Sequence, residues 1–346
     1  MPIMDFARLE HSVLELFVAP NAMVRMSGFY NDNFKFSHNE KEYVLRTPIV
    51  GQPLMDLRCL PEPLIMKTLR DHYPKINAPR LIHTLTAQEK SFCVYTYEQG
   101  DSLEEYCPDA SHIPDWVLLE LVSQISTLHK YNPVVLNDLA RIQQWGKDAD
   151  GFYHYLINFV TLLIHELYQK HHALYESLRL PHDVVRCVLG EEEFLDKRTC
   201  VLCHCDIHRK NILIDPATKH LTIIDWELSL VADPIYDIAT HLHRMHYPRK
   251  QEDLFINTYN RIMGFYRGGG LLKKQIDIYR RIERIKSAYV DCVRVASYLK
   301  TRELTHQERF SCIEKYYAIL SSAYPLCELP HTQWVTKEEV FSILSP

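Results

Sequence analysis

The hydrophobic periodicity of this chain changes near residue 100, and that change sets strong limits on its fold. Short runs of alternating apolar residues, typical of half-buried β-strands, occupy 22–28, 33–37, 42–47, 80–86 and 91–98. "HNEK" separates the second and third runs, as the turn of a hairpin would. Residues 62–72 follow a helical period, so we expect a helix that covers one face of this sheet.

Beyond residue 98 the apolar spacing is mostly helical. Helices are expected at 114–131, at 152–178 and in a series from about 251 onward, and another at 5–17 precedes the strands. The exception is "NILID" (211–215) and "HLTIID" (220–225), which flank "PATK" as the arms of a hairpin. The pattern predicts an α+β protein with a small sheet-rich lobe, residues 1–98, and a larger, mostly helical lobe, residues 99–346.

Composition excludes several classes of protein. The chain has 346 residues, 47% of them hydrophobic, and a formal net charge of −5 without a long basic block, so nucleic acid is not an expected partner. We expect neither secretion nor membrane insertion, because no 18-residue apolar run occurs and the N-terminus lacks a signal-peptide pattern. Ten cysteines without a regular framework indicate a reduced, cytoplasmic protein.

The stretch "VLCHCDIHRKNILID" (201–215) holds the strongest chemical signal. His204, Asp206 and Asn211 satisfy the pattern H-x-D-x-x-x-x-N, and Asp225 ends the second arm of the hairpin. A phosphotransferase needs one carboxylate facing the attacking hydroxyl, and an amide with a second carboxylate to hold magnesium. Asp206 is therefore the candidate catalytic residue, and Asn211 and Asp225 are the candidate Mg²⁺ ligands, because the hairpin brings them to the same end.

A zinc site is the alternative interpretation of the same stretch. It would use Cys203, His204, Cys205 and His208. Structural zinc sites commonly offer two well-spaced ligand pairs, whereas here the Cys-x-Cys spacing is poor and no second pair follows. We therefore favour magnesium held by oxygen atoms.

The series "HCDIHRKNILID…LTIIDWE…ADPIYDIA" resembles the superfamily of aminoglycoside phosphotransferases and choline kinases, which are small-molecule kinases. The resemblance implies a bilobal, protein-kinase-like fold. It also implies that His204, His208 and Asp237 support the catalytic loop. Protein kinases usually have a lysine in place of His208 and continue with Asp-Phe-Gly, where this chain has Asp225-Trp226-Glu227.

The resemblance is looser in the N-terminal lobe. "MSGFYNDNFKF" takes the place of the family's phosphate-covering loop and has a single glycine, Gly28. "EYVLRTP" places Arg46 where the family usually has a phosphate-binding lysine. The resemblance here is to macrolide phosphotransferases, which also read V-L-R at this point. The resemblance makes Glu62 the ion-pair partner of Arg46. It also assigns the segment with Tyr95 and Tyr97 to the adenine edge. Three of these residues also have a structural interpretation. Gly28 fits a turn glycine, Arg46 an exposed strand residue, and Glu62 an acid that stabilises the start of a helix.

The resemblance implies a kinase that uses Mg²⁺ and ATP or GTP to phosphorylate a hydroxyl group of a small molecule. An antibiotic is the expected acceptor, and choline, a sugar or an amino alcohol is the alternative. Glu227 and Asp291 are candidate acceptor contacts, although Asp291 on an apolar helix also fits a structural role. A binding protein that keeps the fold without activity is a further alternative, and a monomer or homodimer is expected.

Overall fold

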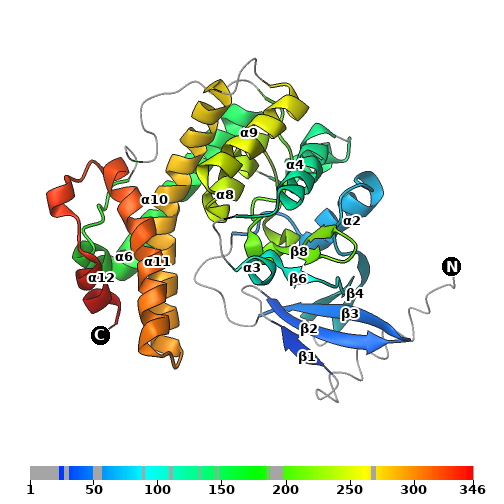
Figure 1. Ribbon diagram of the computed structural model, residues 1–346, viewed down its shortest axis with the longest axis horizontal. Coiled ribbons are helices and arrows are strands. Elements are labelled where there is room, and N and C mark those ends of the chain that lie inside the picture. Colours follow the sequence, from blue (N-terminus) through cyan, green and yellow to red (C-terminus); the bar gives the residue numbers. More distant parts are fainter. Residues whose placement is uncertain are drawn as a thin grey trace. The chain divides into compact units, whose positions relative to one another are not determined.

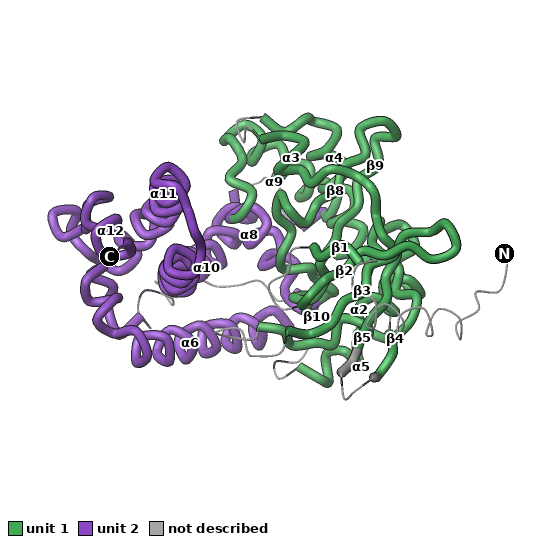
Figure 2. Tube along the Cα trace, turned by 90° about the horizontal axis from the view of Figure 1, so that it is seen from below, with its two compact units in different colours: residues 1–143, 201–231, 244–263 green, residues 144–200, 232–243, 264–346 purple. Residues whose placement is uncertain are grey.

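The computed structural model describes residues 23–26, 31–49, 57–87, 90–108, 112–131, 134–143, 145, 148–184, 187, 198–265 and 270–345. The helix expected at 5–17 lies outside them. The chain divides into two compact units (Figure 2). The first comprises 1–143, 201–231 and 244–263, and the second comprises 144–200, 232–243 and 264–346. The division expected at residue 98 stays a prediction.

An antiparallel sheet in the order β1-β2-β3-β5-β4 forms the start of the first unit in the described part of the chain (Figure 1). Its strands are β1 (Val24–Met26), β2 (Asn31–His38), β3 (Lys41–Pro48), β4 (Leu81–Ala87) and β5 (Lys90–Thr96). Asn39 and Glu40 have φ of 49° and 63°, the left-handed conformation that two-residue hairpin turns require. The hairpin predicted at "HNEK" is therefore present.

The sheet buries an apolar cluster on one face. Phe36, Tyr43, Leu45, Phe92 and Val94 belong to this core. Burying side chains of this size contributes about 1.5–3 kcal/mol each. One face of each strand is therefore apolar, and the resulting alternation allowed the strands to be predicted from the sequence. Helix α2 (Glu62–His72) packs against β4, and its bounds agree with the predicted helix.

A second, smaller sheet in the same unit positions the catalytic loop. β8 (Ile212–Asp215) and β9 (His220–Ile223) form the expected hairpin, and the two-residue strand β6 (Asp101–Ser102) pairs with β8. β7 (Val201–Cys203) pairs with β10 (Leu230–Ala232) at the base of the loop. Helix α3 (Leu103–Tyr106) begins at Ser102, which forms a capping box with Glu105.

Helices surround this sheet within the first unit. α4 (Asp115–Lys130) packs against β7 and against α9 (Arg249–Met263). The buried side chain of His129 on α4 is hydrogen-bonded to the Tyr259 hydroxyl on α9, with 2.8 Å between Nδ1 and the oxygen. The short helix α5 (Leu136–Ile142) follows α4.

The second unit is helical apart from one isolated β-bridge in its described residues. Its helices are α6 (Ala149–Ser177), α10 (Gly270–Thr301), α11 (His306–Ala323) and α12 (Lys337–Leu344). α10 packs against α6 and α11. Helix α8 (Pro234–Met245), which was not among the expected elements, begins in this unit. None of the helices in the described residues has the length and apolar character that a transmembrane span requires.

Candidate active site

Arg46 on β3 is the centre of an ion-pair cluster in the first unit. Its Nη1 lies 2.6 Å from Glu62 Oε1, and its Nη2 lies 2.6 Å from Asp225 Oδ1 and 2.9 Å from Glu227 Oε2. Burial lowers the pKa of the guanidinium, but the three carboxylates outweigh burial and raise it. Arg46 is thus not an ordinary exposed strand residue, and the expected partnership with Glu62 is present.

Glu227 is buried and faces Arg46. Asn31, the first residue of β2, donates from Nδ2 to Glu227 Oε2 at 2.5 Å. Burial raises the pKa of Glu227 to about 8, with Arg46 lowering it and Asp225 and Glu62 raising it further. The guanidinium of Arg58 also lowers the pKa of Glu227, so a second cation acts on this cluster.

The hydroxyl of Tyr95 supports this cluster from the neighbouring strand. It donates to Glu62 Oε2 at 3.2 Å. Burial raises the pKa of Glu62, which begins α2, while Arg46 lowers it. The ring of Tyr97 contacts Lys35, whose Nζ is 3.9 Å from the ring centroid. That both residues line the adenine site remains a prediction.

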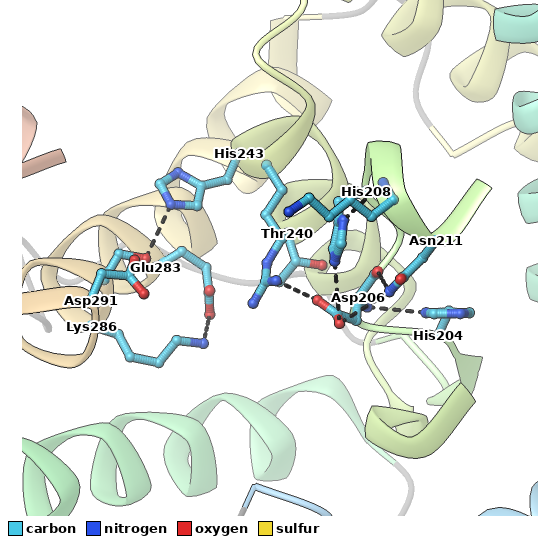
Figure 3. Close-up of polar contacts among 12 residues, drawn as sticks. His204, Asp206, His208, Asn211, Thr240, His243, Glu283, Lys286 and Asp291 are labelled. Atoms are coloured by element: carbon cyan, nitrogen blue, oxygen red, sulfur yellow. Dashed lines mark hydrogen bonds and ion pairs between the residues drawn. The ribbon is translucent and has the colours of Figure 1, made fainter. Parts of the chain in front are cut away.

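His204 lies beside Asp206 and holds the backbone of the catalytic loop (Figure 3). The Asp206 amide donates to His204 Nδ1 at 3.2 Å, so the neutral imidazole donates from Nε2 to the Ile224 carbonyl at 3.0 Å. The ring also packs against Trp226. Cys205 turns the chain between the two residues with a φ of 63°, a conformation that is uncommon outside glycine.

Asn211 connects the loop to the hairpin. Its Nδ2 donates to the Asp206 carbonyl at 3.0 Å and to Asp206 Oδ2 at 3.3 Å, and its carbonyl accepts from the Ile224 amide at 2.9 Å. Asp225 follows Ile224 with a φ of 66°. The hairpin pairing therefore brings Asn211 and Asp225 to one end of β8 and β9, as expected.

The amide orientation leaves Asn211 Oδ1 as the atom that can bind a cation. Together with the carboxylates of Asp225 and Glu227, it offers hard oxygen donors, which suit Mg²⁺. The residues present therefore fit magnesium.

The cysteines and histidines of the loop have other partners. Cys203 is buried with its thiol 3.4 Å from the Val201 carbonyl, and His208 Nδ1 accepts from the Lys210 amide at 3.2 Å. His208 Nε2 lies 3.7 Å from Asp206 Oδ2. Burial lowers the pKa of His208, although Asp206 raises it. These contacts give Cys203 and His208 partners within the loop, and magnesium held by oxygen atoms stays the prediction.

Three candidate residues lie elsewhere. Gly28 is outside the described residues. Asp237, buried in the first turn of α8, and Asp291 on α10 belong to the second unit. Asp291 Oδ1 is 3.4 Å from Arg294 Nη1 one helical turn along. Their roles in loop support and acceptor binding stay predictions.

Sequence reasoning missed two contacts in the site. Asn31 was not among the predicted site residues, and its side chain binds Glu227. Arg244, near the end of α8, lies with Nη1 2.5 Å from Asp206 Oδ1. Nothing in the local pattern "HLHRMH" distinguishes Arg244 from an ordinary helix-end arginine.

Comparison with known proteins identifies the family. A sequence profile described as "Phosphotransferase enzyme family" matches residues 24–270 of the chain. The chain belongs to that family. The resemblance read from the sequence is therefore confirmed. The local relative LicA of Haemophilus influenzae is 32% identical over 78 residues, 22% of this chain and 28% of LicA. The chain thus matches less than a third of the length of that relative.

Solved structures agree on the fold. An ethanolamine kinase of Plasmodium vivax has a TM-score of 0.59 and 15% identity, covering 87% of this chain and 81% of the other. Choline kinase LicA of Streptococcus pneumoniae has a TM-score of 0.53 and 16% identity, covering 90% and 98%. The predicted kinase-like fold, with its antiparallel sheet and mostly helical C-terminal part, is confirmed.

Proposed function

We propose that this chain is a small-molecule kinase that transfers the γ-phosphoryl group of ATP or GTP to a hydroxyl group. The observation that carries the proposal is the hydrogen-bonded series from Asp206 through Asn211 to Ile224, which precedes Asp225. It connects a carboxylate that can receive a proton to two oxygen donors that suit magnesium. Family membership supports the same reaction class.

In this reaction Asp206 orients the acceptor hydroxyl and receives its proton. The acceptor oxygen forms a bond to the γ-phosphorus, the bond to the β,γ-bridging oxygen breaks, and the electron pair leaves with the nucleoside diphosphate. Positioning and charge neutralisation account for most of the rate in such transfers, and the base for a smaller part. His204 holds the loop backbone so that Asp206 stays in place.

Asn211 and Asp225 would hold the magnesium ion, which neutralises charge on the phosphates when it is bound. Arg46 has the charge that the phosphates need, and its planar fork can contact two oxygens at once. Its present partners Asp225 and Glu227 hold it in the same cluster as the proposed metal ligands.

The acceptor class is the finer part of the proposal. The resemblance to macrolide phosphotransferases and the long helical part of the chain favour an antibiotic. The structures of a choline kinase and an ethanolamine kinase, which share the fold, make amino alcohols the second class to test. We also expect the protein to act in the cytoplasm, as a monomer or a homodimer.

The test is a panel of aminoglycosides, macrolides, peptide antibiotics and amino alcohols, incubated with Mg²⁺ and ATP or GTP and examined for a mass gain of about 80 Da. We expect Asp206→Asn to lower turnover by about 10²- to 10⁴-fold, because the general base is lost. Asp215→Asn is the matched control, because Asp215 lies at the other end of β8 and caps the hairpin turn through Ala217.

Near-normal turnover by Asp206→Asn would contradict the assigned role. A wild-type protein that consumes no nucleotide with any acceptor, with and without Mg²⁺, would support the binding-protein alternative.

A further inference from the structure

Arg244 forms an ion pair with the proposed catalytic carboxylate, and its side chain is more exposed than that of a purely structural ion pair. Its Nη1 lies 2.5 Å from Asp206 Oδ1, and 32% of the Arg244 side chain is exposed against 12% of Asp206. The simplest alternative is an arginine that stabilises the end of α8 through the helix dipole. Such a role needs no contact with Asp206.

A structural arginine–aspartate pair elsewhere in the chain provides the comparison. Arg198 donates from Nε and Nη2 to the two oxygens of Asp233, at 3.1 and 2.7 Å. Only 9% and 0% of these side chains are exposed. Arg244 instead meets Asp206 through Nη1 and remains partly open to solvent.

The two oxygens of Asp206 differ in their partners. Oδ2 accepts from Asn211 and lies near His208, whereas buried Oδ1 has no hydrogen bond within the described residues and contacts Arg244. An acceptor hydroxyl that is activated by Asp206 needs a free carboxylate oxygen. Arg244 lies beside Oδ1, the oxygen that remains for this hydroxyl.

Because Arg244 lies beside Oδ1, the charge of the acceptor affects the free energy of its approach to Asp206. A neutral or cationic acceptor that displaces Arg244 from Oδ1 breaks this ion pair and supplies no anion to replace it. An acceptor with an anionic group beside its hydroxyl exchanges one ion pair for another. Charge-assisted hydrogen bonds from arginine to carboxylate or phosphate are strong and are frequently bidentate.

A second cation adds to the positive potential of this region. Arg209, three residues after Asp206, has buried Nη1 and Nη2 atoms without a hydrogen-bond partner among the described residues. Its guanidinium opposes the rise that burial causes in the pKa of Tyr247, three residues after Arg244. His208 adds no negative charge beside Asp206, whose carboxylate pairs with Arg244.

We infer that Arg244 binds the acceptor and selects molecules that carry a carboxylate or phosphate group beside the reacting hydroxyl. The inference rests on the proposed function and narrows its acceptor class. It disfavours choline and ethanolamine, which carry a cation and no anion. The transfer itself is unchanged: the hydroxyl proton passes to Asp206 while Arg244 holds the anionic group.

Anion binding tests the inference separately from turnover. Titration calorimetry would measure binding of malonate, inorganic phosphate and choline to the protein saturated with Mg²⁺ and a non-hydrolysable ATP analogue, which fills the nucleotide phosphate sites. We expect malonate or phosphate to bind, and Arg244→Gln to weaken that binding by about 10- to 100-fold. The malonate and phosphate arms distinguish a carboxylate acceptor from a phosphorylated one.

Two further variants keep the experiment decisive. Lys210→Gln is the matched control, because Lys210 is an exposed cation of the same loop that pairs with Glu104 at 3.6 Å. It should bind the anions as the wild type does. Asp206→Asn frees Arg244 from its partner and should bind them equally or more tightly, which tests the inference even if Arg244→Gln does not fold.

The inference is overturned if anions bind equally to wild type and Arg244→Gln, or if neither anion binds the nucleotide-loaded protein. It is also overturned if choline binds better than both anions. Failure of the proposed function looks different, because the wild type would then consume no ATP or GTP with any acceptor of the panel.

For any acceptor found in the panel, the same change predicts a specific kinetic pattern. Arg244→Gln should raise KM by about 10- to 100-fold for an anionic acceptor. Lys210→Gln should leave that KM within about threefold of the wild type. A KM for the anionic acceptor that Arg244→Gln leaves unchanged would contradict the inference.

Discussion

At the scale of single residues, the site is a cluster of three carboxylates around Arg46. Arg46 is the ion-pair partner of Glu62, Asp225 and Glu227, and Asn31 supplies a neutral donor to Glu227. Removing one partner from a buried ion pair costs about 3–5 kcal/mol, because it leaves an uncompensated charge. The cluster is therefore as important for folding as for any reaction.

Glu227 gives this cluster a pH dependence. Burial raises its pKa from 4.5 to about 8, so between these values the folded protein holds a proton that the unfolded chain has released. The free energy of unfolding should therefore fall as the pH rises from about 4.5 to 8, by at most about 1.4 kcal/mol per pH unit from this group. Glu227→Gln, which cannot ionise, should lack that decline. Urea unfolding at several pH values without Mg²⁺ measures it.

The unfolding of wild type and Glu227→Gln can also contradict the raised pKa of Glu227. If the free energies of unfolding of wild type and Glu227→Gln run parallel across this range, Glu227 is ionised throughout and Arg46 outweighs the effect of burial. A gap that widens with rising pH agrees with the raised pKa.

The sequence allowed some of these residues to be predicted and not others. Asp206, Asn211 and Asp225 follow from spacing, because a short loop and a tight hairpin convert sequence distance into spatial distance. The contact of Asn31 with Glu227 spans 196 positions, and that of Arg244 with Asp206 depends on the end of a distant helix. No local pattern encodes contacts of this kind.

At the scale of secondary structure elements, β6 joins the chain after the first sheet to the catalytic hairpin. Gly100, just before it, has a φ of 137°, and an added Cβ would lie 2.7 Å from the Ile214 carbonyl oxygen. Only glycine tolerates both the conformation and the close approach. The missing side chain of Gly100 thus lets β6 lie directly against β8.

We expect Gly100→Ala to lower the free energy of unfolding by about 1–3 kcal/mol, because it adds backbone strain and a collision with Ile214. Gly264→Ala is the matched control. Gly264 also has a positive φ, 69°, but an added Cβ would meet nothing within 4 Å. Chemical denaturation of both variants separates conformational strain from the collision. Equal losses would show that the approach to Ile214 contributes nothing.

Prediction succeeded for elements with a clear pattern. The strands β2 to β5 and the helix α2 were predicted within a few residues, because one buried face imposes an alternation or a helical period. β6, β7 and β10 have two or three residues, too few for a period. α8 also has a helical period, with Ile235, Ile238, Ala239 and Leu242 buried, and this signal was missed.

At the scale of the whole molecule, the proposed function links stability to Mg²⁺ and nucleotide. A ligand that binds the folded state at 100 times its Kd stabilises it by about 2.7 kcal/mol. We expect a non-hydrolysable ATP analogue with Mg²⁺ to raise the Tm, and excess EDTA to remove most of that rise. Asp225→Asn should abolish the part that depends on Mg²⁺, while Asp215→Asn responds as wild type. Thermal unfolding followed by circular dichroism measures these shifts.

The Mg²⁺ dependence is the informative part of this experiment. An equal rise in Tm with and without Mg²⁺ would mean that the nucleotide binds without the metal. An equal rise in Asp225→Asn and wild type would mean that another residue binds the ion.

The position of Trp226 offers a spectroscopic consequence. Its buried indole ring lies 4.5 Å from the His204 ring, centroid to centroid, and its neighbours in the chain are Asp225 and Glu227. Indole emission responds to nearby charge and to contact quenchers, so the chain has an intrinsic fluorophore between two carboxylates of the proposed site. With the other three tryptophans replaced by phenylalanine, its emission would follow the arrival of a cation in real time, without an added dye.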